Sequence, residues 1–70
     1  MDTRDALLAM YETVSKVILK HRTHEELEAA YLDSILHKAQ SYTLTELWVT
    51  LSLAKKIAMS EGWMKAEDND

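Results

Sequence analysis

The chain of 70 residues contains no cysteine and no proline, and its single glycine is Gly62. Without cysteine it can form neither disulfides nor a zinc–thiolate site, and a reducing compartment is the simplest expectation. Without proline, and with glycine only near the end, the sequence lacks the usual signals for turns between strands. Because the apolar side chains follow helical spacing throughout, the sequence predicts an all-α fold.

The missing residue types also argue against catalysis and cofactor binding. The sequence has no glycine-rich phosphate loop, no cysteine nucleophile and no serine in a nucleophile elbow. His21 and His24 have H-x-x-H spacing next to Glu25 and Glu26. A helix break between the two histidines and the lack of a third strong ligand argue against a metal site there. We therefore expect no enzyme activity, no cofactor and no bound metal.

Positive charge is scarce as well. Eight Lys and Arg against twelve Asp and Glu give a net charge of -4, which disfavours binding to nucleic acid and to anionic lipid. The N-terminus has no basic region followed by a long apolar core, and the longest uncharged stretch of the last predicted helix covers only residues 47–54. Neither a signal peptide nor a membrane span fits. We expect a cytoplasmic protein.

Three capping signals divide the chain into predicted helices of about residues 3–21, 24–41 and 44–61. The signals are the pairs Asp2 with Asp5, Thr23 with Glu26, and Thr43 with Glu46. The two threonine pairs have the spacing of a capping box, in which the threonine hydroxyl and the glutamate carboxylate each accept a backbone N–H bond. Before the last box, Tyr42 is expected to pack on Leu47 as a hydrophobic staple.

These helices are predicted to form a single domain, residues 1–64, with the architecture of a small three-helix bundle. Gly62 suits the left-handed C′ position after the last helix, and Trp63 is expected to fold back on Ile57 or Ala58. Residues 65–70 are predicted to be an acidic flexible tail. Because neither inter-helix turn contains glycine or proline, a helical hairpin with one long bent helix is the alternative.

The first two predicted helices each carry one apolar face. The face of the first contains Leu7, Met10, Tyr11, Val14, Val17 and Ile18. The face of the second contains Tyr31, Leu32, Ile35, Leu36, Ala39 and Tyr42. We expect these two faces to cover the side of the third helix that carries Leu44, Leu47 and Leu51.

The third predicted helix has apolar side chains on two opposite faces. At about 100° per residue, one stripe contains Leu44, Leu47, Trp48, Leu51, Ala54 and Ala58. Val49, Leu53 and Ile57 form a second stripe across the helix. Two neighbours in a compact three-helix bundle produce one broad stripe instead of two opposed ones. Because an exposed apolar patch usually marks an interaction site, the second stripe is expected to bind another chain.

These features predict a small non-enzymatic regulatory or adaptor protein, in the style of small bacterial or phage proteins, that acts by protein–protein interaction. We expect a homodimer through the third helix, since two-fold dimers are the commonest assembly, that binds and modulates a larger protein. The candidate interface consists of Val49, Leu53, Ile57, Trp48 and Trp63.

Two alternatives fit the same features. In the first, the chain is a chaperone or structural subunit of a hetero-complex, and a different protein covers the third helix. In the second, it is a DNA-associated transcriptional regulator that presents basic side chains as a dimer, namely Arg4, Lys16, Lys20 and Arg22. The first turns of the third helix offer mostly apolar side chains, so we do not expect it to act as a recognition helix.

Overall fold

The structure, a computed structural model, describes residues 2–65 of the chain. It contains three helices, α1 (Thr3–Arg22), α2 (Glu25–Ala39) and α3 (Leu44–Ser60), and no strand among the described residues. The all-α prediction is confirmed, and breaks at residues 23–24 and 40–43 separate the helices instead of joining two of them into one long bent helix. Apart from Lys65, the predicted tail lies outside the described residues.

Side-chain hydrogen bonds begin two of the three helices where the sequence places them. At the start of α1, the backbone N–H of Asp5 donates to the Asp2 carboxylate at 2.8 Å. At the start of α3, the N–H of Glu46 donates to the Thr43 hydroxyl at 3.1 Å, and the N–H of Thr43 donates to the Glu46 carboxylate at 2.8 Å. The predicted capping box at Thr43 is therefore confirmed.

The predicted capping box at Thr23 is wrong. Thr23 ends α1, because its backbone N–H donates to the Leu19 carbonyl at 3.0 Å. His24 then precedes α2, and its side chain makes no capping hydrogen bond. Since only two residues separate α1 from α2, the residue that terminates the first helix lies one position too early to cap the second.

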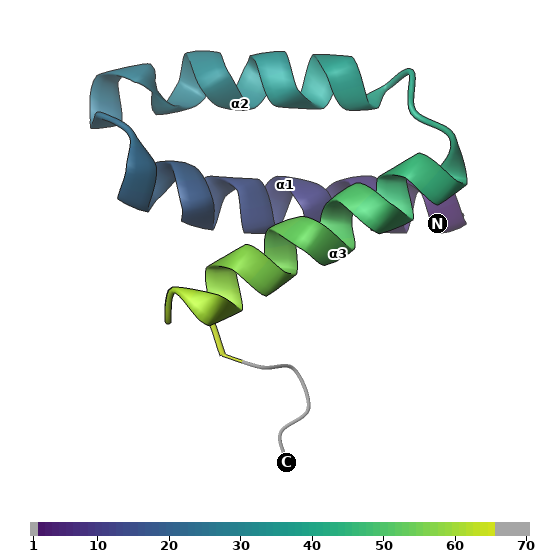
Figure 1. Cartoon of the computed structure of the whole chain (residues 1–70). Helices are drawn as coiled ribbons and strands as arrows, with labels where there is room; N and C mark the ends of the chain where they lie inside the picture. Colours follow the sequence, from purple (N-terminus) through teal and green to yellow (C-terminus); the bar gives the residue numbers. More distant parts are fainter. Residues whose placement is uncertain (1, 66–70) are drawn as a thin grey trace.

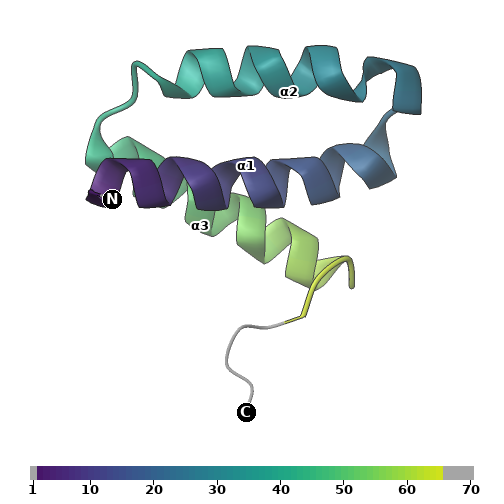
Figure 2. The ribbon, with the colours of Figure 1, turned by 180° about the vertical axis from the view of Figure 1, so that it is seen from behind.

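Helix α1 is the centre of an open three-helix arrangement. Figures 1 and 2 show α2 running alongside α1 in the opposite direction, whereas α3 crosses α1 obliquely on one face of that pair. Both α2 and α3 pack on α1, but they approach each other only slightly. The Cα atoms span 35 × 30 × 18 Å, so the arrangement is flattened along one axis.

The core lies mainly between α1 and α3. The buried apolar residues are Leu7, Val14, Ala39, Leu47, Leu51 and Ala58. Leu47 and Leu51 of α3 are the largest fully buried side chains, and Tyr42 packs against the cluster that contains them. Helix α2 contributes only Ala39 to it, so α2 is the least buried of the three helices.

The end of α3 is tied back to the end of α1. Gly62 has φ +79°, its N–H donates to the Met59 carbonyl at 3.1 Å, and the N–H of Trp63 donates to the Ala58 carbonyl at 2.8 Å. These bonds form a Schellman motif, which confirms the predicted role of Gly62. Trp63 packs against the core, and its ring also stacks on His21 of α1, with the ring centres 4.7 Å apart.

Candidate protein-interaction surface

One side of α3 presents aliphatic side chains to solvent at three successive turns. Val49, Leu53 and Ile57 recur every four residues, and their exposed fractions are 48%, 57% and 46%. These three residues are called the outer stripe below. The stripe lies across the helix from Leu47 and Leu51, which are buried, because the α1 contact reaches only one arc of α3. The structure thus brings the three residues together on a face that the monomer leaves open.

Leu44 and Trp48 belong to the same sequence stripe as Leu47 and Leu51 but are exposed in the structure. Leu44 is 47% exposed, so the expectation that the other two helices cover it is wrong, and Trp48, a residue of the candidate interface, is 60% exposed. Helix α2 contributes only Ala39 to the core on this side. Leu44 lies in the first turn of α3 and Trp48 lies at the edge of the stripe, and α1 leaves both of them accessible.

A shallow groove continues the outer stripe toward the end of α1. It is lined by Ile18, Arg22, Leu53, Lys56, Ile57, Ser60 and Glu61. An ion pair stands in this groove, with the Arg22 guanidinium and the Glu61 carboxylate 3.7 Å apart. The apolar stripe is therefore bordered by charged side chains near the end of α3.

The two tryptophans of the predicted interface do not lie on the outer stripe. Trp48 is separated from Val49 by about 100° around α3, on a different exposed side. Trp63 is partly buried between the end of α3 and α1, where Arg22 lies over its ring at 5.4 Å from the centre. Val49, Leu53 and Ile57 form one surface, whereas Trp48 and Trp63 belong to others.

Helix α2 also exposes two large apolar side chains. Leu27 is 43% exposed and Tyr31, one turn later, is 47% exposed. Tyr31 was predicted to lie on the packed face of α2, which is wrong because only α1 covers this helix. The i, i+4 spacing of Leu27 and Tyr31 is the sequence signal for this surface.

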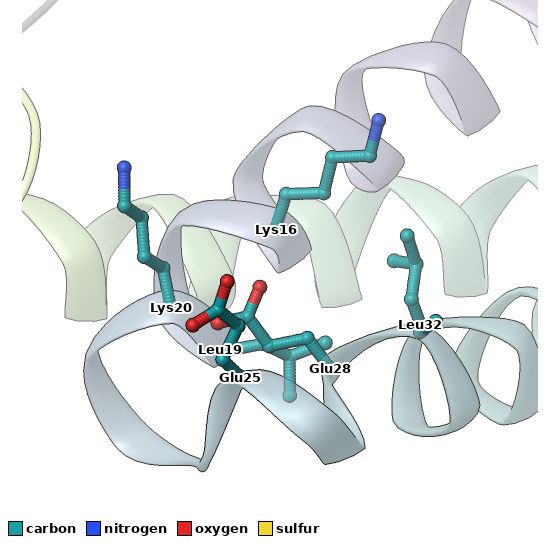
Figure 3. A pocket seen from close by; sticks show the side chains of 7 residues that line it. Lys16, Leu19, Lys20, Glu25, Glu28 and Leu32 are labelled. Atoms are coloured by element: carbon teal, nitrogen blue, oxygen red, sulfur yellow. The ribbon is translucent and has the colours of Figure 1, made fainter.

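A second groove, which the sequence does not predict, lies between α1 and α2. Figure 3 shows the seven residues that line it, which are Lys16, Leu19, Lys20, Glu25, Glu28, Ala29 and Leu32. This hollow of about 480 Å³ is called the α1–α2 groove below. Its lysines come from α1 and its glutamates from α2, so the residues meet only through the packing of two helices.

Burial raises the pKa of the Tyr11 hydroxyl above its ordinary value of 10.0, and Tyr42 nearby raises it further. No group of three His, Cys, Asp or Glu side chains within residues 2–65 is arranged to hold a metal ion. Over the same residues, none of the helices has the length and hydrophobicity needed to cross a membrane.

Comparisons with protein-family models, curated proteins and solved structures find no match to this chain.

Proposed function

We propose that this chain is a small non-enzymatic regulatory or adaptor protein that forms a two-fold homodimer through the outer stripe of α3 and binds a larger protein. The supporting observation is the exposure of Val49, Leu53 and Ile57, each about half accessible to solvent. Burying such surface is favourable by roughly 25 cal/mol per Å². A helix that is apolar around most of its circumference is typically covered on more than one side.

A stable dimer of this chain has to bury more surface than the outer stripe alone provides. A standard interface buries about 800 Å² per partner, which is about one-sixth of the 5141 Å² accessible surface of this molecule. Three half-exposed aliphatic side chains are too few to supply that area. The proposed interface therefore includes the adjoining groove, with Ile18 and Lys56 at its edges.

The charges beside the outer stripe favour an antiparallel pairing of the two α3 helices. Glu46 lies in the first turn of α3, and Lys56 lies in its second half. In an antiparallel pair, Glu46 faces the half of the other helix that carries the partner's Lys56. A parallel pair would instead place like charges side by side, which costs free energy.

The first test measures the mass of the protein in solution. We expect a dimer whose mass is stable over a wide concentration range by sedimentation velocity or light scattering. Leu53→Glu places a charge in the middle of the outer stripe and should produce a monomer that keeps its helical circular dichroism. The matched control is Ser52→Glu, which adds the same charge to the next exposed position outside the stripe and should remain dimeric.

Three outcomes would contradict the homodimer. A well-folded wild-type monomer at high concentration would exclude it directly. Global unfolding of Leu53→Glu would assign the residue to the monomer core, and equal dissociation of the Leu53→Glu and Ser52→Glu variants would remove the outer stripe as the interface.

Trp48 favours a second candidate function, that of a chaperone or structural subunit in a hetero-complex. Its side chain is 60% exposed and lies to one side of the stripe, so a simple α3 pair leaves it uncovered. Acrylamide quenching of Trp48 fluorescence in a Trp63→Phe background separates the two candidates. A homodimer through the stripe leaves Trp48 accessible, whereas a Trp48 that is shielded only when another protein is present supports the hetero-complex.

The contacts of the basic side chains do not favour the DNA-associated alternative. Arg4 donates to the Gln40 carbonyl at 2.6 Å, Lys16 pairs with Glu12 at 3.5 Å, and Arg22 pairs with Glu61. Binding to phosphates would compete with these contacts. Salt-sensitive binding to duplex DNA is the measurement that would revive this alternative.

A further inference from the structure

We propose that the α1–α2 groove is the surface that binds the target, and that its occupant is an amphipathic helix of another protein with acidic side chains along one edge and basic side chains along the other. This inference rests on the proposed function, because it names the docking surface of the adaptor and the chemistry of its partner. The outer stripe of α3 serves self-association, and the groove serves recognition.

The two rims of the groove carry opposite charges. Lys16 and Lys20 stand on the α1 rim, and Glu25 and Glu28 stand on the α2 rim. Figure 3 shows the lysine side chains extending away from the glutamate carboxylates. No ion pair crosses the groove within the described residues, and Lys16 pairs instead with Glu12 of its own helix. The two rims are therefore not joined by an ion pair.

Apolar side chains form the floor. Leu19 comes from α1, and Ala29 and Leu32 come from α2. Glu25 to Leu32 spans two helical turns, or about 10 Å along the axis. A helix laid in this groove would place two successive turns of apolar side chains on the floor and its flanking side chains against the rims, which is the helix-in-groove mode of recognition.

The groove opens away from α3. On α1, Lys16 lies about 200° around the helix from Val14, and Val14 is buried in the core with Leu47 and Leu51. An occupant of the groove therefore does not touch the outer stripe. One molecule can bind a second copy and a target at the same time.

Most of the surface of α2 is not covered by the other helices. It has 15 residues and only Ala39 is fully buried, whereas Leu32 and Leu36 are partly exposed. A helix this short is marginal without tertiary packing. A partner helix in the groove would cover the flank of α2 that carries Ala29 and Leu32.

The charges of the groove select the arrangement of charge in the partner, not its net charge. Two lysines and two glutamates make the rims neutral overall. A helix with carboxylates facing α1 and ammonium groups facing α2 pairs with both rims. Because reversing a helix end for end exchanges its two edges, any helix with segregated edges can meet this requirement in one of the two directions.

Synthetic helical peptides of about 18 residues test the proposal with the full-length protein, by titration monitored with two-dimensional NMR. One peptide carries glutamates on one edge and lysines on the other, and a second has the same composition with both charges mixed on each edge. We expect the segregated peptide to bind about tenfold more tightly, since several charge pairs of modest strength are made or lost. Chemical-shift changes should map to residues 16–32.

Reversing the charges of the α1 rim distinguishes direct contact with the peptide from a general effect on the structure. The variant Lys16→Glu with Lys20→Glu has two acidic rims and should lose about tenfold in affinity for the segregated peptide. It should gain affinity for a third peptide with lysines on both edges. Rescue by the matching peptide requires direct contact with the rims.

The floor is tested with neighbouring alanines of α2. Ala29 lines the groove and Ala30 does not, and both are exposed. Ala29→Glu should abolish peptide binding, whereas the control Ala30→Glu should leave it unchanged.

The proposal is overturned by equal affinity for the segregated and mixed peptides, by equal effects of the two alanine substitutions, or by failure of the rescue. It is also overturned if Leu53→Glu remains dimeric and Ala29→Glu becomes monomeric, because a second copy then occupies the groove. Wild-type mass in solution is read separately, so loss of the homodimer and loss of peptide binding are distinguishable.

Discussion

Helices α2 and α3 both pack on α1, but they do so in different ways. Helix α3 begins with a capping box, ends with a Schellman motif and buries Leu47, Leu51 and Ala58. Helix α2 begins at His24 with no side-chain cap and buries only Ala39. The better-anchored helix is also the one that exposes more apolar surface, with five large side chains against two on α2.

The difference shows that the anchoring of a helix in the fold and the amount of apolar surface it exposes are independent properties. Anchoring depends on end-capping and on one buried arc, and α3 has both. The apolar surface of α3 beyond that arc is not buried in the monomer, and it is the surface on which the proposed self-association rests. Helix α2 has fewer exposed large apolar side chains than α3, and it also has fewer buried ones. Its packing against the rest of the molecule is therefore less complete.

The largest expected effect contrasts a leucine from each helix. Leu51→Ala removes a side chain that is 1% exposed and should lower the free energy of unfolding by about 2–5 kcal/mol. Leu32→Ala in α2 removes a partly exposed side chain and should cost about 1 kcal/mol. Urea unfolding at a single protein concentration measures both, and equal losses would contradict the difference in anchoring.

A smaller effect contrasts the two threonines that precede α2 and α3. Thr43→Ala removes the hydroxyl that accepts the Glu46 N–H bond in the capping box of α3. It should lower the free energy of unfolding by about 1 kcal/mol. Thr23→Ala removes a hydroxyl that caps no helix start, and its effect should be within about 0.5 kcal/mol. Thermal unfolding of the pair provides the comparison, and a loss at Thr23 as large as at Thr43 would restore the predicted box before α2.

The smallest effect concerns Tyr11, on the packed side of the central helix. Burial raises the pKa of its hydroxyl in the folded state above 10.0, so ionisation opposes folding. The stabilisation is fully present below pH 10 and is lost as the pH rises through the folded-state pKa. Tyr11→Phe should make this decline in the free energy of unfolding less steep. Tyr31→Phe removes an exposed phenol and should leave the decline unchanged. Equal curves for both variants would contradict the assignment.

The sequence predicts helix ends well where a side chain itself makes the capping bond. Thr43, Glu46 and Gly62 each act within a few residues of chain, so local spacing is enough to identify them. The same spacing at Thr23 fails because α1 continues to Arg22 and uses Thr23 for its own termination. Thr23 fits both the end of α1 and the start of α2, and the sequence spacing alone does not show which of the two helices uses it.

The sequence predicts the exposed stripe of α3 less completely, because exposure depends on how the helices meet. The separation of Val49, Leu53 and Ile57 from the buried side follows from helical period alone. Exposure of Trp48 depends on α2 lying away from α3, and no local pattern specifies that distance. The α1–α2 groove has the same origin, since its lysines and glutamates belong to different helices.

The thinness of the molecule gives the proposed partners a further role. The Cα atoms extend only 18 Å along the shortest axis, and the described residues bury six apolar side chains, so the core of the single chain is small. A second molecule on α3 would enlarge this core by covering Val49, Leu53 and Ile57. Resistance to heat would then increase with protein concentration, so the folded lifetime of this protein in a cell would depend on how much of it is present.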